Sequence, residues 1–596
     1  MLVFLFICGI GDFKDNLYAV SYNCKLQIIT HWVKCMLNFR QALASLGTWL
    51  KGDLKDKWRL AFLTFAIAYA VFLLLISGHM SAKWDEVTHL SGGLYLLRGD
   101  FDSYLNYNGF YPPMYDLATA AFYSVGGASV FAARAVSLVF SLLSLSAVFE
   151  FGYRLSAPKI GLLASMLMAI MPGFIFVSRL AMIETMLIFL FTVSALLFFE
   201  WIRNGKEKYL LLSGLALGLG ILTKYQAVIV GAIMLTGLAV LGWGYLKTRL
   251  KRFPLLVLVA VLVVVPWVVA SYQMYANHML DTWLYALNIG NPDKTLYSLG
   301  FNSAGGNRLP HFYADIPSLL QIPVFYMLEM SAPYADIHPV SMFFFGLGLA
   351  GLALFAWRRR PVDKYLLLWF VVVYLFFTAI PNRHWRYVVP VFPVLAWAVA
   401  SFLFSGLDTA RNLWENKHLS VSGKRFSQVI ACALMVFTLV AVYYNVDDAY
   451  TWVAKDQVYI PVQEAAEYAA AHIGPNESIV VVNAQNLYSE DMVRFYMNAK
   501  GSSNTVWQYP TEPVDTYTIN FNITELIALC KEHNTKYVFT YEFGGTVPYF
   551  NTTISLRDIY AQLYDSGNFT KLLENGTSIF GLPPRRIFVL SFLGER

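Results

Sequence analysis

The stretch of sequence that decides the fold runs from residue 58 to residue 89 and reads WRLAFLTFAIAYAVFLLLISGHMSAKWDEVTH. Its first 21 residues are long and apolar enough to cross a bilayer, since a spanning helix needs about 20 mostly apolar residues. An acidic pair, Asp85 and Glu86, follows and begins a polar loop that also carries His89 and a Tyr111-Pro112-Pro113 turn. A carboxylate pair held at a membrane surface is energetically costly, so this loop is the first place to look for an active site.

The composition extends this pattern to the whole chain. Of the 596 residues, 57% are hydrophobic and 14% are charged, against roughly 25% charged in an average soluble protein. We therefore expect an α-helical polytopic membrane protein with about eleven transmembrane helices. The expected spans lie near residues 58–78, 131–152, 159–177, 181–202, 208–223, 226–246, 254–272, 339–357, 364–380, 387–405 and 427–445.

Basic residues predict the orientation, because cytoplasmic loops carry an excess of Lys and Arg. They gather before the first span and in alternate loops, at residues 51–59, 154–159, 203–208, 247–252, 358–364 and 411–425. Two long loops, 79–130 and 273–338, and the tail after residue 445 are then extracytoplasmic. Five Asn-x-Ser/Thr sequons agree with this orientation because they lie in that tail, at Asn476, Asn522, Asn551, Asn568 and Asn575.

The chain is expected to have three parts. Residues 1–57 form a cytoplasmic N-terminal segment, with Met36 as an alternative start, and residues 58–445 form the transmembrane domain. Residues 446–596 form an extracytoplasmic α/β domain, because helical patterns alternate there with strand-like runs. The helical patterns cover 462–473, 523–532 and 555–564, and the strand-like runs cover 479–482, 536–539 and 587–590. Helices are also expected in the first outer loop, at 84–98 and 113–125.

Several charged residues are expected at the outer membrane face, against the cytoplasmic bias of positive charge. The basic ones are Arg134, Arg179, Lys224, Arg383 and Arg386. Each of these basic side chains could belong to a functional site or could only extend to the lipid headgroups. Glu184 could be a structural partner of Arg179 or Arg134. Asp85 and Glu86 could cap a helix, and His89, four residues after Asp85, could be hydrogen-bonded or join it in binding a metal. No basic stripe with interleaved aromatics occurs, so we expect no nucleic-acid binding.

The order of these features resembles that of the GT-C glycosyltransferases that use a polyprenyl-phosphate sugar. The likeness is to the group of protein O-mannosyltransferases, lipid A aminoarabinose transferases and RgtA/B/C/D-like enzymes, over about residues 80–405. The matching motifs are Asp85-Glu86, Arg98-Gly99-Asp100, Tyr111-Pro112-Pro113, Arg134, Arg179 with Glu184, Thr223-Lys224-Tyr225, and Arg386-Tyr387 before Pro390. The family usually has Asp where this chain has Glu184.

The resemblance implies an inverting glycosyltransferase of the cell membrane, a GT39/GT83-like hexosyltransferase. It would move a sugar from a polyprenyl- or dolichyl-phosphate donor to a protein, lipid or glycan acceptor outside. Asp85 would be the base, and Glu86 would support the acceptor or orient the site. The other implied site residues, which hold the phosphate and the substrates, are His89, Arg134, Arg179, Glu184, Lys224, Arg383, Arg386 and Tyr387.

The chemistry needs such residues, because a base must take the acceptor's proton and cations must stabilise the leaving phosphate. This interpretation requires no cofactor, although a divalent metal ion could take part. Two alternatives remain, an oligosaccharyltransferase or ligase of the same superfamily and a multi-pass transporter.

Overall fold

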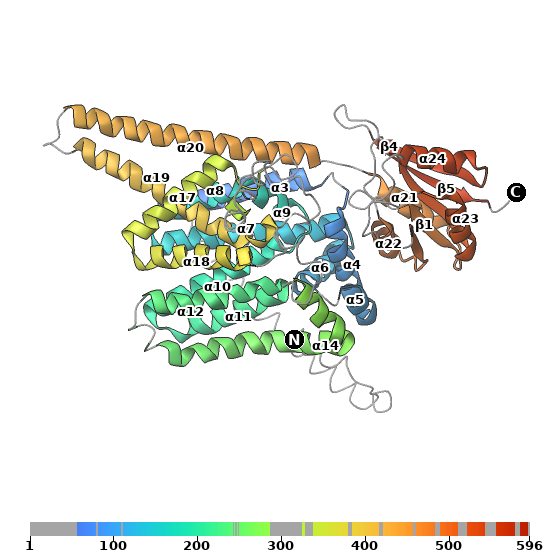
Figure 1. The fold of residues 1–596 in the computed structure, drawn as a ribbon, viewed down its shortest axis with the longest axis horizontal. Coiled ribbons are helices and arrows are strands. Elements are labelled where there is room, and N and C mark those ends of the chain that lie inside the picture. Colours follow the sequence, from blue (N-terminus) through green and yellow to red (C-terminus); the bar gives the residue numbers. More distant parts are fainter. Residues whose placement is uncertain are drawn as a thin grey trace.

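The computed structural model describes most of residues 56–593 (Figure 1). The stretches it leaves out within that range are 79–80, 109–110, 242–243, 245–246, 248, 287–324, 328–329, 331–337, 380–383, 416–420, 457–459, 483–488, 511–520, 543–555 and 578–584. Residues 1–55 of the predicted N-terminal segment, most of the loop 273–338, and Arg383 therefore lie outside the described residues.

The larger part of the chain is a bundle of apolar helices, as predicted. Each of the eleven predicted spans contains a helix. These are α3 (Lys57–Ser77), α7 (Val130–Leu155), α8 (Pro158–Ala169) with α9 (Pro172–Arg179), α10 (Glu184–Asn204), α11 (Glu207–Thr223), α12 (Ile229–Leu241), α14 (Phe253–Ala286), α17 (Met342–Arg358), α18 (Pro361–Ala379), α19 (Phe392–Glu415) and α20 (Val421–Asp456). Among the described residues, seven helices are long and apolar enough to cross a membrane, or eight if α8 and α9 form one bent span. The protein is thus a multi-pass membrane protein.

The third predicted span, 159–177, is not one straight helix. It is broken into α8 and α9, which meet at an angle of 70°. Pro172 is the cause, because proline disfavours helical geometry in the residue before it and is itself well accepted at the first position of a helix. Met171 is accordingly extended, with φ −67° and ψ 126°. The bend directs α9 so that it ends at Arg179, and the following turn reaches the first outer loop.

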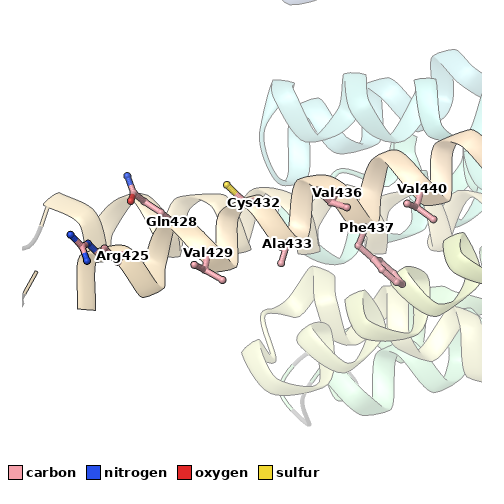
Figure 2. A pocket seen from close by; sticks show the side chains of 8 residues that line it. All are labelled: Arg425, Gln428, Val429, Cys432, Ala433, Val436, Phe437 and Val440. Atoms are coloured by element: carbon pink, nitrogen blue, oxygen red, sulfur yellow. The ribbon is translucent and has the colours of Figure 1, made fainter. Parts of the chain in front are cut away.

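Two helices are longer than hydropathy predicts. Helix α14 continues past residue 272, and α20 continues to Asp456, so the predicted domain boundary at 445 falls inside α20. Hydropathy identifies the residues that favour the lipid environment. A helix can continue beyond those residues into the water on either side. An open hollow lies along α20, and Figure 2 shows the side chains that line it, among them the apolar Val429, Val436 and Phe437, which are suited to lipid.

Three shorter helices lie at one end of the bundle (Figure 1), and the first of them carries the acidic pair. They are α4 (Trp84–Arg98), α5 (Phe101–Asn108) and α6 (Met114–Gly126). Helix α4 has the predicted bounds and ends at Gly99, whose left-handed φ of 70° favours glycine. The described residues between the main helices include the 3₁₀ turns η1 (Tyr225–Val228), η2 (Leu250–Arg252), η4 (Trp385–Tyr387) and η5 (Val389–Val391).

The C-terminal part is a small α/β domain, as predicted. Its sheet has the strand order β2-β1-β3-β5-β4, in which β1 pairs in parallel with β2 and β3, and β5 pairs antiparallel with β3 and β4. The strands are β1 (Ser478–Val482), β2 (Val506–Tyr509), β3 (Thr535–Glu542), β4 (Phe569–Thr577) and β5 (Arg585–Phe592). The helices are α21 (Val462–His472), α22 (Glu490–Ala499), α23 (Ile523–Glu532) and α24 (Leu556–Asp565).

This domain packs against α4, the helix that carries the acidic pair. Helix α22 contacts α4, and Leu90 and Leu94 of α4 belong to the same hydrophobic cluster as Phe495 of α22. Ser81 and Ile460 exchange two hydrogen bonds of 2.6 Å, which tie the start of the domain to the segment before α4. The C-terminal domain therefore helps to fix the position of α4.

Candidate active site

Asp85 lies in the first turn of α4 and pairs with a cation that is 301 positions away in the chain. The Nη1 atom of Arg386 donates to Oδ2 of Asp85 over 2.9 Å. Arg386 belongs to the 3₁₀ turn η4, which is fixed by His384, since its Nδ1 accepts from the Arg386 amide over 3.1 Å. The Asp85 side chain is 53% exposed and that of Arg386 25% exposed, so a substrate can reach both.

A second pair lies beside the first. Lys224 follows the last residue of α11 and places its Nζ 3.1 Å from Oε1 of Glu184, the first residue of α10. The same Nζ lies 5.4 Å from the centre of the Tyr387 ring, next in sequence to Arg386. Glu184 is buried, and its Oε2 has no hydrogen-bond partner in the described part of the chain.

Tyr111 lies within electrostatic range of both pairs. Partial desolvation raises the pKa of its phenol, although the side chain is partly exposed, and the charges of Asp85, Arg386 and Glu184 also act on it. The site therefore combines two carboxylates, two cations and the aromatic rings of Tyr111 and Tyr387. Sequence reasoning named Tyr111 only as part of a turn, because its distance from the charges depends on how α4 and α6 pack.

Glu86 and Arg134 form a closed ion pair next to this site. Both oxygens of the Glu86 carboxylate accept from Arg134, each over 2.8 Å, and they also accept from the backbone amides of Ala181 and Lys83. Arg134 donates further to the carbonyl oxygens of Ser77 and Ser81. Both side chains are buried.

This geometry changes the interpretation of both residues. Burial would raise the pKa of the Glu86 carboxyl, but the charge of Arg134 and the hydrogen bonds to Glu86 outweigh it, so the pKa is lowered. Arg134 was predicted to hold a phosphate and Glu86 to be catalytic. Because their polar atoms are engaged with each other and with the backbone, we now interpret them as the structural pair that joins α3, α4, α7 and the turn after α9.

Arg179 does not reach out to lipid headgroups, because the residue is completely buried at the end of α9. Its guanidinium lies 5.9 Å from the centre of the Phe176 ring. A phosphate could contact it only after a rearrangement, so of the predicted phosphate ligands within the described residues, Lys224 and Arg386 are the accessible ones.

His89 lies one helical turn after Asp85 and belongs to a buried network that the sequence did not reveal. Its Nδ1 lies 2.8 Å from Oδ1 of Asp116, a fully buried residue of α6. Oδ2 of Asp116 accepts from Asn108 over 2.6 Å and from the Tyr104 hydroxyl over 3.1 Å. His89 is thus hydrogen-bonded, which is one of the two alternatives above. The only signal of Asp116 in the sequence is its place after the Tyr-Pro-Pro-Met-Tyr motif.

No group of three or more His, Cys, Asp or Glu side chains that could hold a metal ion occurs among the residues described. The predicted site residues that the structure brings together are Asp85, Glu184, Lys224, Arg386 and Tyr387, with His89 one turn along α4.

Part of the chain resembles a known protein family. The profile of the dolichyl-phosphate-mannose–protein mannosyltransferase family matches residues 96–282. This segment of the chain is therefore similar to that family. It includes Asp116, Arg134, Glu184 and Lys224.

One curated relative and two solved structures extend the comparison. The relative is the undecaprenyl phosphate-alpha-4-amino-4-deoxy-L-arabinose arabinosyl transferase of Edwardsiella ictaluri (strain 93-146), 28% identical over 207 residues. That match spans about a third of each protein, 34% of this chain and 32% of the relative. ArnT from Cupriavidus metallidurans in the apo state has a TM-score of 0.52 at 12% identity, covering 89% of this chain and 97% of ArnT.

ArnT from the same organism bound to undecaprenyl phosphate has a TM-score of 0.51 at 14% identity, covering 89% of this chain and 98% of ArnT. At these identities the two solved structures show a shared fold. The protein has the GT-C fold, as the sequence predicted, and the family that matches residues 96–282 is one of glycosyltransferases.

Proposed function

We propose that the protein is an inverting glycosyltransferase of the membrane. It takes a sugar from a polyprenyl- or dolichyl-phosphate donor and passes it to a hydroxyl group of an acceptor on the extracytoplasmic face. The observation that carries this proposal is the contact of Asp85 with Arg386, over 2.9 Å, beside the pair of Lys224 and Glu184. A carboxylate and two accessible cations are the groups that this reaction requires.

Each of these groups has a defined task in the reaction. The acceptor oxygen attacks the anomeric carbon while its proton moves to the Asp85 carboxylate. The bond from that carbon to the phosphate oxygen breaks, and the phosphate leaves with the electron pair. Lys224 and Arg386 stabilise the negative charge that develops on the leaving phosphate, so no general acid is needed. Attack from the side opposite the phosphate inverts the configuration of the sugar.

The contact of Arg386 with Asp85 also suits this sequence of events. A bound phosphate competes for Arg386, because guanidinium groups pair strongly with phosphate oxygens. When Arg386 turns toward the phosphate, it releases the Asp85 carboxylate, which is then open to the acceptor hydroxyl. Binding of the donor thereby prepares the base for the acceptor.

Charge distribution supports the extracytoplasmic location of the site. Helices α7 and α10 begin near the site and carry Arg154 and Arg203 in their last turns, at the other end of the bundle. The positive-inside rule assigns such basic ends to the cytoplasm. Asp85, Lys224 and the C-terminal domain would then face the outside, where the sequons of the tail also lie.

The test is a transfer assay with the purified full-length chain and donors that carry a radiolabelled sugar. Dolichyl-phosphate mannose and undecaprenyl-phosphate aminoarabinose are the first two donors, and a membrane extract supplies acceptors. Asp85→Asn should lower label transfer by about 10²–10⁴-fold, which is the usual contribution of a positioned base.

The matched control is Asp102→Asn, because Asp102 is an exposed acid of the same outer loop. This control should retain transfer. Transfer that survives Asp85→Asn would remove Asp85 from the role of base. If labelled lipid crossed vesicle membranes without any transfer of its sugar, the protein would be a transporter instead.

A further inference from the structure

Asp116 is a buried carboxylate to which the reaction above assigns no task. It lies in α6 with no exposed surface, and it contacts three polar side chains from α4 and α5. The backbone leaves room for it, because a Cβ atom on Gly92 would lie 2.7 Å from its Oδ2. A buried carboxylate is costly unless it is fully hydrogen-bonded, and here both oxygens have partners.

The partners of Asp116 determine which nitrogen of His89 carries the proton. Asp116 Oδ1 faces Nδ1 of His89, while Oδ2 already accepts from Asn108 and Tyr104. A carboxylate only accepts, so Nδ1 must be the donor. In the neutral imidazole, Nε2 then keeps its lone pair and is a hydrogen-bond acceptor.

Nε2 is the ring nitrogen that Asp116 does not contact. Within the described part of the chain, Nε2 makes no hydrogen bond. The His89 ring lies in edge contact with Tyr111, with 6.1 Å between the ring centres, and with Tyr115 at 5.0 Å. Tyr111 is in turn close to Asp85, since the Asp85 charge acts on its phenol. His89 is 6% exposed, so a bound molecule can complete its surroundings.

We propose that His89 Nε2 accepts a hydrogen bond from a substrate hydroxyl, and that Asp116 is a positioning residue that keeps Nε2 in this acceptor form. The hydroxyl belongs either to the transferred sugar or to the acceptor, which share this chemistry. The inference rests on the proposed function and adds a group that recognises one of its substrates.

Asp116→Asn tests the tautomer without removing a side chain. An asparagine has one oxygen and one NH₂ group, and the two donors Asn108 and Tyr104 attract its oxygen. Its NH₂ group then faces His89 Nδ1, which has to accept and therefore gives its proton to Nε2. The variant thus turns Nε2 from an acceptor into a donor while the ring stays in place.

The loss should be about 10- to 100-fold in kcat/KM, the range expected when one substrate hydrogen bond is replaced by a mismatch. If the hydroxyl belongs to the acceptor, the acceptor KM or kcat changes and the donor KM does not. If it belongs to the sugar, the donor parameters change. In a serine protease, where the histidine is itself the base, the same substitution costs about 10⁴-fold in kcat.

The exchange variant Asn108→Asp/Asp116→Asn provides the decisive rescue. The carboxylate at position 108 attracts the NH₂ group of the new asparagine, so its oxygen faces His89 again and Nδ1 regains its proton. This double variant keeps the net charge and the number of atoms, and it should recover most of the activity lost in Asp116→Asn. Tyr104→Phe removes one donor but leaves Asn108 in place, so it should lose less than about 3-fold.

A second measurement reads the tautomer directly and does not depend on activity. Protein labelled with ¹⁵N-histidine is studied by magnetic resonance at pH 8, with His89→Gln to assign the signal. His89 should carry its proton on Nδ1 in the wild type and the exchange variant, and on Nε2 in Asp116→Asn.

The outcomes separate the two proposals. Wild-type activity in a folded Asp116→Asn protein would overturn the inference, as would an exchange variant that restores the tautomer but no activity. A wild-type protein that carries the His89 proton on Nε2 would overturn it as well. If the wild type transfers no sugar from any donor, the proposed function fails, whereas the magnetic resonance signal still decides whether Asp116 sets the tautomer.

Discussion

Replacing Arg134 by leucine tests whether this residue stabilises the fold or binds the donor. The substitution leaves the buried Glu86 carboxylate without its guanidinium partner, and the carbonyl oxygens of Ser77 and Ser81 lose a donor. Removing one partner of a buried ion pair costs about 3–5 kcal/mol. We therefore expect Arg134→Leu to lower the melting temperature of the detergent-solubilised protein by roughly 10 °C, at about 2–4 °C per kcal/mol for a cooperative unit of ordinary size.

The stability lost in Arg134→Leu should depend on pH, because it arises from the ionised Glu86 carboxylate. In the wild type the folded pKa of Glu86 is lowered, so its stabilising effect is complete above the ordinary value near 4.5 and is lost as the pH falls. In Arg134→Leu burial acts without the opposing charge and raises the folded pKa. The variant is then destabilised most at high pH. Its loss of unfolding free energy relative to the wild type should shrink by up to about 1.4 kcal/mol for each unit that the pH falls from 8 to 5.

Thermal unfolding followed by tryptophan fluorescence at several pH values is the assay. Arg411→Leu is the matched control, because Arg411 pairs with Glu415 over 2.7 Å and both side chains are exposed, and such pairs contribute about 0–1 kcal/mol. An Arg134→Leu protein that unfolds like the wild type but binds the donor poorly would refute this reasoning. It would return Arg134 to the predicted role of phosphate ligand.

Three further predictions concern the site and its support. Arg386→Gln should lower kcat/KM by at least about 10²-fold and change the melting temperature little, because its ion pair is partly exposed; transfer kinetics and thermal unfolding check this. Gly92→Ala should lower the free energy of unfolding by about 1–3 kcal/mol, since its Cβ would lie 2.7 Å from the Asp116 carboxylate. In the control Gly346→Ala the Cβ meets nothing within 4 Å, so thermal unfolding should show a neutral or slightly stabilising effect. Phe495→Ala removes a buried ring from the cluster shared by α22 and α4 and should cost about 3–5 kcal/mol, with faster proteolysis of the C-terminal domain.

The sequence predicts the fold well where a local pattern decides it. Helix α4 has the predicted bounds because a first turn with Asp85 and Glu86 and a following Gly99 are local signals of a helix start and end. The α/β domain follows from alternating patterns in the same way. Hydropathy fails where the helix and the lipid-facing length differ, as in α20, and where Pro172 bends the chain within an apolar run.

The site is predicted less completely, because its contacts join distant parts of the chain. The positive-inside rule finds Arg134 and Arg386 on the same side of the membrane, but it cannot tell that Arg134 meets Glu86 inside the protein while Arg386 meets Asp85 at an accessible surface. Asp116 is a single acid without a repeating pattern. Its importance appears only when three helices bring His89, Asn108 and Tyr104 to it.

The most direct test of the account is a cryo-electron microscopy structure of the full chain with a bound polyprenyl-phosphate sugar. We expect the phosphate oxygens to lie about 2.7–2.9 Å from nitrogen atoms of Lys224 and Arg386, with the anomeric carbon between the phosphate and Asp85. A phosphate bound at the other end of the bundle, near Arg154 and Arg203, or an Asp85 carboxylate turned away from the sugar, would contradict the account.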